Sequence, residues 1–175
     1  KWQKAGLELK VSINSSIREF RDKNMAKSIL DTLAKTGCPA HLIQIEITEK
    51  FALEAEAEKS IIQQMRTLEN EGIVFILDDF GTGYASFRYI QLLPIHIIKI
   101  DQTFTNSVMH SEKHHRLVHG MVQLGRSMNL TVIAEGVETE EQKELLSSFG
   151  CEALQGYYIS KPVAAREIQS IVNNR

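Results

Sequence analysis

The chain has 175 residues, 43% hydrophobic and 24% charged, which is enough for one sizeable hydrophobic core. A formal net charge of −2 argues against binding of nucleic-acid polymers, which usually requires a basic surface. No apolar run approaches the roughly 18 residues of a membrane span, nothing resembles a signal peptide, and the two cysteines are typical of reduced thiols. We therefore expect a cytoplasmic domain, or the cytoplasmic part of a membrane-anchored parent.

Strand-like and helix-like segments alternate along the whole chain. Alternating or β-branched apolar runs predict the strands, and apolar residues at helical spacing predict the helices. In chain order, the predicted strand and helix pairs are 7–14 with 15–36, 43–48 with 55–70, 73–77 with 86–92, 95–100 with 110–128, 130–135 with 138–149, and 153–157 with 164–172.

Six such units indicate parallel strands with helical crossovers, and hence an α/β sheet or barrel. A complete (β/α)8 barrel takes about 250 residues, so six units account for the observed length. Either the fold is an open sheet, or the opening units of a TIM-like barrel are missing. Because the first residue is Lys1 and not Met, we favour the second arrangement, with residues 1–175 as one incomplete domain.

The most informative single stretch runs from Ile73 to Tyr84. Its apolar run ends in two adjacent carboxylates, Asp78 and Asp79, followed by Gly81-Thr82-Gly83. Buried like charges stay ionised only if cations compensate them, and glycines let a backbone approach a ligand closely. A metal site and an ordinary polar turn explain this stretch about equally well.

Polar side chains recur at the ends of all six predicted strands. The carboxyl ends of parallel strands lie on one side of the molecule, where α/β proteins bind their ligands. We therefore expect one mouth that gathers Asn14, Glu46, Asp78, Asp79, Lys99 with Asp101, Glu135 and Gln155. Each residue alone has an ordinary explanation: Lys99 and Asp101 could form an ion pair, and Asn14 could cap a helix. As a set at one end of a sheet, they indicate a site.

The residue types suggest the chemistry of that site. Carboxylate and amide oxygens suit Mg²⁺ or Mn²⁺, and histidine is absent from the strand ends, which argues against zinc. More oxygen ligands than one ion normally takes point to two ions about 3.5–4 Å apart, which activate water for displacement at phosphorus. Lys99 could hold the attacking water or neutralise charge on phosphate oxygens.

Four histidines between residues 110 and 119 include pairs at the i, i+4 spacing of a helical metal clamp: His110, His114, His115 and His119. They belong to a predicted helix away from the strand ends. We interpret them as a solvated helix face.

The motifs in order resemble one family throughout the chain. The matching stretches are Val-Ser-Ile-Asn-Ser-Ser (11–16), Ile-Glu-Ile-Thr-Glu (45–49), Leu-Asp-Asp-Phe-Gly-Thr-Gly-Tyr (77–84), Leu-Pro-Ile-His-Ile-Ile-Lys-Ile-Asp (93–101), Ile-Ala-Glu-Gly-Val-Glu-Thr (133–139) and Gln-Gly-Tyr-Tyr-Ile-Ser-Lys-Pro (155–162). On these stretches the chain resembles the EAL domain family of cyclic di-GMP phosphodiesterases.

The resemblance implies a modified (β/α)8 barrel that hydrolyses cyclic di-GMP to linear pGpG with two Mg²⁺ or Mn²⁺ ions. It implies metal ligands at Asn14, Glu46, Asp78, Asp79 and Glu135, and catalytic roles for Lys99, Glu135 and Gln155. It further implies substrate contacts at Asp79, Gly81 and Thr82, and a glutamate, Glu49, that stabilises the loop after Asp79.

The resemblance also implies a homodimer formed near that loop and, in the parent protein, fusion to an upstream sensory or GGDEF-type domain. The family's Glu-Ala-Leu motif, together with two opening strands, is expected ahead of Lys1 and thus outside the chain. Its glutamate is a metal ligand in the family. A module that binds cyclic di-GMP without hydrolysing it therefore stays open as the alternative, and a partner-binding regulator is a weaker third possibility.

Overall fold

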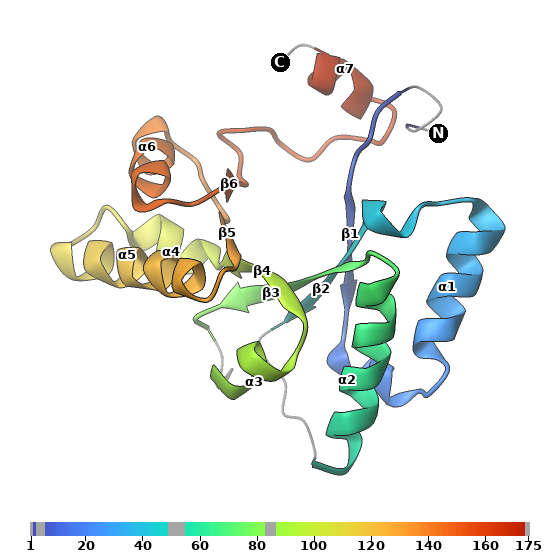
Figure 1. Ribbon diagram of the computed structural model, residues 1–175. Helices are drawn as coiled ribbons and strands as arrows, with labels where there is room; N and C mark the ends of the chain where they lie inside the picture. Colours follow the sequence, from blue (N-terminus) through green and yellow to red (C-terminus); the bar gives the residue numbers. More distant parts are fainter. Residues whose placement is uncertain (1, 3–5, 49–54, 83–86, 174–175) are drawn as a thin grey trace.

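The computed structural model describes residue 2 and residues 6–48, 55–82 and 87–173. Within these ranges six strands form one parallel sheet in which each strand lies beside its sequence neighbour (Figure 1). The strands are β1 (Val11–Ser15), β2 (Ile43–Thr48), β3 (Val74–Phe80), β4 (Ile95–Ile100), β5 (Thr131–Ala134) and β6 (Ala153–Leu154). The predicted α/β class and its six units are confirmed.

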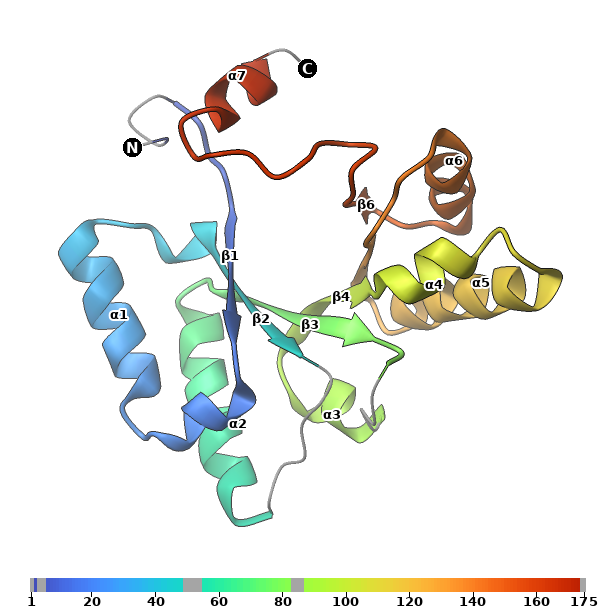
Figure 2. The same cartoon turned by 180° about the vertical axis from the view of Figure 1, so that it is seen from behind.

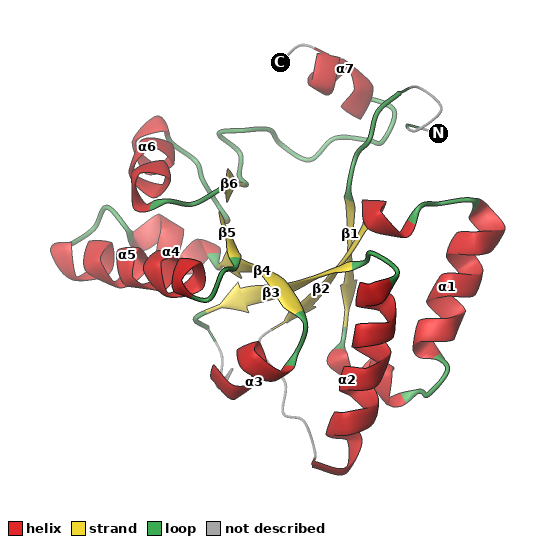
Figure 3. Ribbon diagram, viewed as in Figure 1, coloured by secondary structure: helices red, strands yellow, loops and turns green. Residues whose placement is uncertain are grey.

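Helices connect the strands and cover the outside of the curled sheet (Figures 1 and 3). They are η2 (Ile17–Arg21), α1 (Met25–Thr36), η3 (Ala40–Leu42), α2 (Ala55–Asn70), α3 (Phe87–Leu92), α4 (Gln102–Ser107), α5 (Glu112–Ser127), α6 (Glu140–Phe149) and α7 (Ile168–Asn173). Among the described residues, no helix has the length and apolar character needed to cross a bilayer.

One predicted helix was wrong in its extent, and one helix was not predicted. The helix expected over residues 15–36 is divided, because Ser16 caps the short η2 through a capping box with Glu19 and the chain then turns before α1. The helix expected over 110–128 is preceded by α4, which begins where the Asp101 side chain accepts a hydrogen bond from the Thr103 N–H. Several remaining boundaries differ by one to four residues, which is ordinary fraying of element ends.

One face of the sheet is apolar and packs against the helices, and the other face carries apolar residues together with the charged ones. On β2, Ile43, Ile45 and Ile47 are buried toward the helices, while Glu46 points to the opposite face. Strand residues such as Phe75, Ile98 and Val132 pack with α2 and α5 into one continuous core. This core holds the strands in a register that places Asn14 beside Glu46 and Glu46 beside Ile76.

The sheet is open between β1 and β6. β1 is an edge strand, and its apolar residues Val11 and Ile13 are 38% and 50% exposed. The segment after β6 returns across this opening toward the N-terminal segment, as both views show (Figures 1 and 2). There the Trp2 indole N–H donates to the Ala165 carbonyl at 3.2 Å. The sheet is therefore a half-barrel rather than a closed barrel.

Candidate active site

The buried ammonium group of Lys99 is the centre of the site. Its Nζ lies 2.6 Å from Glu135 Oε1, 3.0 Å from Glu46 Oε2 and 3.3 Å from Asp78 Oδ1. These carboxylates come from the ends of β2, β3 and β5, and Lys99 comes from β4 between the last two. The structure thus brings together four of the residues predicted from their places at strand ends.

Both members of the closest ion pair have shifted pKa values. Burial by itself would lower the pKa of Lys99, but the hydrogen bond and charge of Glu135, with help from Glu46 and Asp78, raise it above its ordinary value. Burial raises the pKa of Glu135 above its usual 4.5, and the nearby Asp78 and Glu46 charges add to this against the effect of Lys99. Lys99 is therefore protonated, and the raised pKa of Glu135 makes its carboxylate a better proton acceptor than an ordinary glutamate.

The turn after Asp78 has a strained backbone. Asp79 has a φ of 56°, the left-handed region that residues other than glycine seldom adopt, and Gly81 follows with a φ of 98°. The Asp79 N–H donates to Asp78 Oδ1, and Thr82 donates through both its N–H and hydroxyl to the Asp79 carbonyl. This network fixes the Asp78 carboxylate and the backbone of Asp79, whereas Gly83 and Tyr84 lie outside the described residues.

The two outermost predicted residues, Asn14 and Gln155, lie beside the cluster rather than in it. Asn14 is exposed on the edge strand β1, opposite Glu46 in register. Gln155 is exposed just after β6 and borders a pocket of about 340 Å³. That pocket is lined by Gln102, Glu135, Gly136, Glu138, Gln155, Gly156 and Tyr157. It joins the Lys99 cluster through Glu135.

Five of the residues that line this pocket were not predicted as site residues: Gln102, Gly136, Glu138, Gly156 and Tyr157. All of them except Gln102 stand within the stretches that carry the family resemblance, and that was the available signal. Gln102 gave no signal because the helix that it begins was not expected.

Asp101 was predicted to sit beside Lys99, and this prediction was wrong. Its side chain is the N-cap of α4 and accepts hydrogen bonds from the N–H and hydroxyl of Thr103. Lys99 instead forms its ion pairs, within the part of the chain that the structure describes, with the three clustered carboxylates. The predicted loop-stabilising Glu49 lies outside the described residues.

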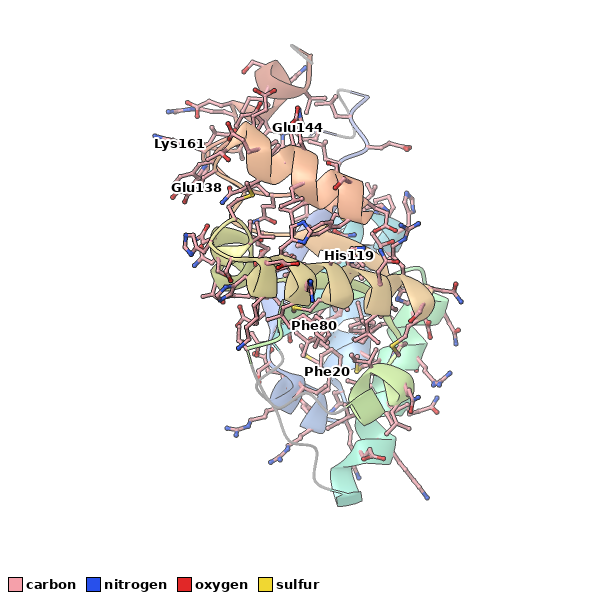
Figure 4. The ribbon with its side chains drawn as sticks, turned by 90° about the vertical axis from the view of Figure 1, so that its left-hand side faces the viewer. Phe20, Phe80, His119, Glu138, Glu144 and Lys161 are labelled. Carbon is pink, nitrogen blue, oxygen red and sulfur yellow. The ribbon has the colours of Figure 1, made fainter. Side chains whose placement is uncertain are left out.

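Of the α5 histidines, His114 and His115 are half-buried and His119 is exposed, and Figure 4 labels His119 on this helix. The rings of His115 and His119 lie 4.8 and 4.9 Å from that of Phe149, measured between centroids. His114 Nδ1 lies 2.7 Å from the Ser111 hydroxyl at the start of the helix. Two of these histidines therefore pack against α6, and a third takes part in the N-cap of α5.

A Glu-Ala-Leu tripeptide does occur in the chain, at residues 152–154, and the sequence reasoning overlooked it. Its glutamate precedes β6 and accepts a 2.7 Å hydrogen bond from the Val132 N–H. Its other oxygen lies 4.0 Å from Arg126 Nε. Glu152 therefore pairs with the backbone of β5 at the opposite end of the strands, and it adds no carboxylate to the site.

The donor types of the site suit a hard divalent cation. Three carboxylates around one ammonium group leave two negative charges in excess in a largely buried place, which favours a cation. As they stand, however, no three acidic, imidazole or thiol groups of the described residues are arranged to hold a metal ion. The carboxylates converge on Lys99 instead. The residues present fit a divalent ion in chemistry, and each carboxylate has a second oxygen to offer.

A parallel half-barrel with charged groups gathered at the carboxyl ends of its strands defines a TIM-barrel-like α/β protein with its site in the usual place. The chain belongs to the EAL domain family, whose model matches residues 1–162. The fold class inferred from the sequence is thereby confirmed together with the family.

Relatives and solved structures agree with this assignment. Over 160 residues the chain is 36% identical to the cyclic di-GMP phosphodiesterase PdeL of Escherichia coli, covering 91% of the chain and 44% of PdeL. The solved complex of the Pseudomonas aeruginosa phosphodiesterase MucR with c-di-GMP is 32% identical, with a TM-score of 0.85 over 95% of this chain and 67% of that one.

A manganese and c-di-GMP complex of Klebsiella pneumoniae BlrP1 is 25% identical to this chain, with a TM-score of 0.79 over 92% of this chain and 41% of that one. The chain spans between about a fifth and less than a half of the curated relatives that it matches.

Proposed function

We propose that this chain carries the site of a metal-dependent phosphodiesterase that hydrolyses cyclic di-GMP to linear pGpG. The observation that carries the proposal is the convergence of Glu46, Asp78 and Glu135 on the buried Lys99. A purely structural ion pair needs one carboxylate, whereas three leave an excess of buried negative charge that costs stability unless a cation compensates it. PdeL and MucR, the relatives described above, are named for this activity.

Asn14, Glu46, Asp78, Asp79 and Glu135 would hold two Mg²⁺ or Mn²⁺ ions. When bound, such ions polarise phosphate oxygens and lower the pKa of a water molecule, so that the water can lose a proton at neutral pH and attack. The crystallised BlrP1 complex contains manganese, which supports a divalent ion at the corresponding site here.

Glu135 is suited to accept the proton of the attacking water, because its pKa is raised by burial and by the neighbouring carboxylates. The water oxygen bonds to phosphorus as the bond from phosphorus to the ribose 3′ oxygen breaks, and that oxygen takes a proton from solvent. The product is a linear dinucleotide with a 5′-phosphate. Gln155 lies at the edge of the same pocket and would orient the water.

Lys99 would hold the attacking water and neutralise charge that develops on the phosphate. An ammonium group has three N–H donors, and three carboxylate oxygens lie within 3.3 Å of Nζ. Lys99 can therefore hold a water only in exchange for one carboxylate contact.

The turn at Asp79, Gly81 and Thr82 would contact the substrate, since it directly follows Asp78 and hydrogen bonds fix its backbone. A homodimer formed near this turn, an upstream sensory or GGDEF-type domain and a cytoplasmic location complete the proposal. MucR, named as a bifunctional diguanylate cyclase and phosphodiesterase, supports such a fusion.

The proposal is tested by incubating the purified chain with cyclic di-GMP and Mn²⁺ and separating the nucleotides by chromatography. We expect linear pGpG to form with Mn²⁺, no product in excess chelator, and a large loss of rate in Glu135→Gln. Product formation that is insensitive to chelation, or unchanged in Glu135→Gln, would overturn the proposed chemistry.

A sensor that binds cyclic di-GMP without hydrolysing it is the second candidate. It is favoured by the convergence of the three carboxylates on Lys99, since no three acidic, imidazole or thiol groups of the described residues are arranged to hold a metal ion. A binding titration run beside the turnover assay separates the two. Nucleotide that is bound but still intact after long incubation with Mn²⁺ would establish the sensor.

A further inference from the structure

The side chain of Gln142 joins the loop after β5 to the helix after β4. Its Oε1 accepts hydrogen bonds from the N–H groups of Glu138 at 2.8 Å and Thr139 at 3.2 Å. Its Nε2 lies 3.4 Å from the carbonyl oxygen of Thr105 in α4 and donates to it. Gln142 is 8% exposed and Thr105 is fully buried, so this polar connection lies inside the protein.

Helix capping accounts for only part of this arrangement. Thr139 and Gln142 form a capping box at the start of α6, in which the glutamine needs only to accept from the Thr139 N–H. The shorter bond to Glu138 and the donation to Thr105 lie beyond that motif. Buried polar groups are usually hydrogen-bonded. These two extra bonds connect Gln142 of α6 to the loop after β5 and to α4.

The loop that Gln142 holds carries Glu135. The Glu135 N–H donates to the Ile100 carbonyl and the Val137 N–H donates to the Gln155 carbonyl. Gly136 has a φ of 69°, and a Cβ there would come 2.5 Å from Cβ of Gln102 in α4. The Gln142 bonds to the N–H groups of Glu138 and Thr139 complete the fixation of this loop against α4.

We propose that Gln142 is a positioning residue that holds Glu135 in contact with Lys99 and keeps the site able to bind a divalent ion. The inference rests on the proposed function, in which Glu135 is both a ligand and a proton acceptor. We call the three hydrogen bonds of the Gln142 side chain the brace. Lys99 belongs to β4 and Glu135 follows β5. Because the brace joins the segments that follow these two strands, it supports the 2.6 Å contact between Lys99 and Glu135.

Two substitutions separate the brace from the cap. Gln142→Glu keeps the acceptor for Glu138 and Thr139 but removes the donor to Thr105, whereas Gln142→Leu removes all three bonds. Gln123→Leu is the matched control. The Gln123 Nε2 donates a hydrogen bond to the Phe149 carbonyl oxygen, 2.9 Å away, at the other end of α6 and away from the site.

Three experiments are made on the full chain. The first measures Mn²⁺ affinity from the paramagnetic resonance of free Mn²⁺. The second measures the acetylation of Lys99 without metal, and the third measures kcat and KM for cyclic di-GMP. We expect Mn²⁺ affinity to fall about tenfold in Gln142→Leu, as for loss of groups that orient metal ligands, and about threefold in Gln142→Glu. Lys99 acetylation should rise several-fold in Gln142→Leu, kcat should fall more than KM rises, and Gln123→Leu should match the wild type.

The outcomes distinguish the inference from the proposed function. Wild-type protein that neither binds Mn²⁺ nor turns over cyclic di-GMP refutes the proposed function, and Lys99 acetylation still tests the brace. Gln142→Glu and Gln142→Leu variants that lose thermal stability but match the control in Mn²⁺ affinity and Lys99 acetylation would refute the brace and leave Gln142 as a helix cap.

Discussion

The middle of the sheet and its two edges differ in how their polar groups are buried and paired. At the ends of β2 to β5 the charged groups of the Lys99 cluster are paired and withdrawn from solvent. Lys99 and Glu46 are buried, at 5% and 9% exposed, and Asp78 and Glu135 are half-buried. On β1 and after β6, Asn14 and Gln155 are exposed, and β1 also shows its apolar residues to solvent. Charges in the middle must be compensated within the protein, which fixes their geometry. The exposed groups at the edges are accessible to a ligand, but neighbouring side chains hold them less closely than they hold the groups in the middle.

The largest difference should follow from removing the charge at the centre. In Lys99→Met three buried carboxylates lose their shared cation, and the free energy of unfolding at pH 7 should fall by about 3–5 kcal/mol. Mn²⁺ should restore part of this loss, since a divalent ion compensates the same charges. Urea denaturation with and without Mn²⁺ measures both effects.

The control for this experiment is Lys113→Met on the exposed side of α5, which should change stability by no more than about 0.5 kcal/mol. Equal losses in the two variants would show that the Lys99 cluster is not an electrostatic centre.

A pair of isoleucines compares the middle and the edge directly. Ile13 and Ile45 lie opposite each other in register, but Ile13 is 50% exposed and Ile45 is 3% exposed. Ile45→Ala should cost about 2–5 kcal/mol because it leaves a cavity in the core. Ile13→Ala should stay within about 0.5 kcal/mol. If chemical denaturation gives similar costs, β1 is covered in solution, for example by a second copy of the chain.

Gly81 tests whether the turn after Asp79 is fixed against the helices. A Cβ at this position would come 2.6 Å from Met121 Cε and 2.7 Å from the Phe104 ring, at a φ of 98°. Gly81→Ala should therefore lower the free energy of unfolding by about 1–3 kcal/mol. Gly37→Ala has a similar positive φ but nothing within 4 Å, so it isolates the backbone strain. A Gly81 cost no larger than that of Gly37 in thermal unfolding would mean that the turn moves away freely.

Another effect, small near pH 9, is a dependence of stability on pH away from the site. Burial, with a contribution from Glu152, raises the pKa of Cys151 from 9.0 to about 12. Above pH 9 the unfolded chain loses this proton while the folded chain keeps it, so stability should fall as pH rises from 9 toward 12. Urea midpoints of the wild type and Cys151→Ala should converge over this range, and a constant difference would place the thiol in contact with water.

The sequence predicted best those elements that have one clear pattern. Strict alternation in Ile43–Thr48 and helical spacing in Ala55–Asn70 gave the observed bounds of β2 and α2. Helix α4 was missed because Thr-Phe-Thr-Asn-Ser has weak helical propensity, and tertiary packing together with the Asp101 cap decides it.

The location of the site was predictable, but its internal geometry was not. Parallel topology alone places Glu46, Asp78, Lys99 and Glu135 on one side. Their convergence on Lys99 depends on register irregularities between β3 and β4 and on the strained Asp79, which no periodicity reveals. Gln142 had a local signal in its spacing from Thr139, yet that signal predicts only a helix cap.

The central claim is that the Lys99 cluster is a catalytic centre and not merely a structural ion-pair network. Its most direct test is the rate of pGpG formation from cyclic di-GMP by wild type and Lys99→Met, both saturated with Mn²⁺ and both shown to be folded. We predict a rate at least about a hundredfold lower in Lys99→Met, as for loss of a group that stabilises developing charge. Equal rates in the two proteins, or no Mn²⁺-dependent product from the wild type, would contradict the claim.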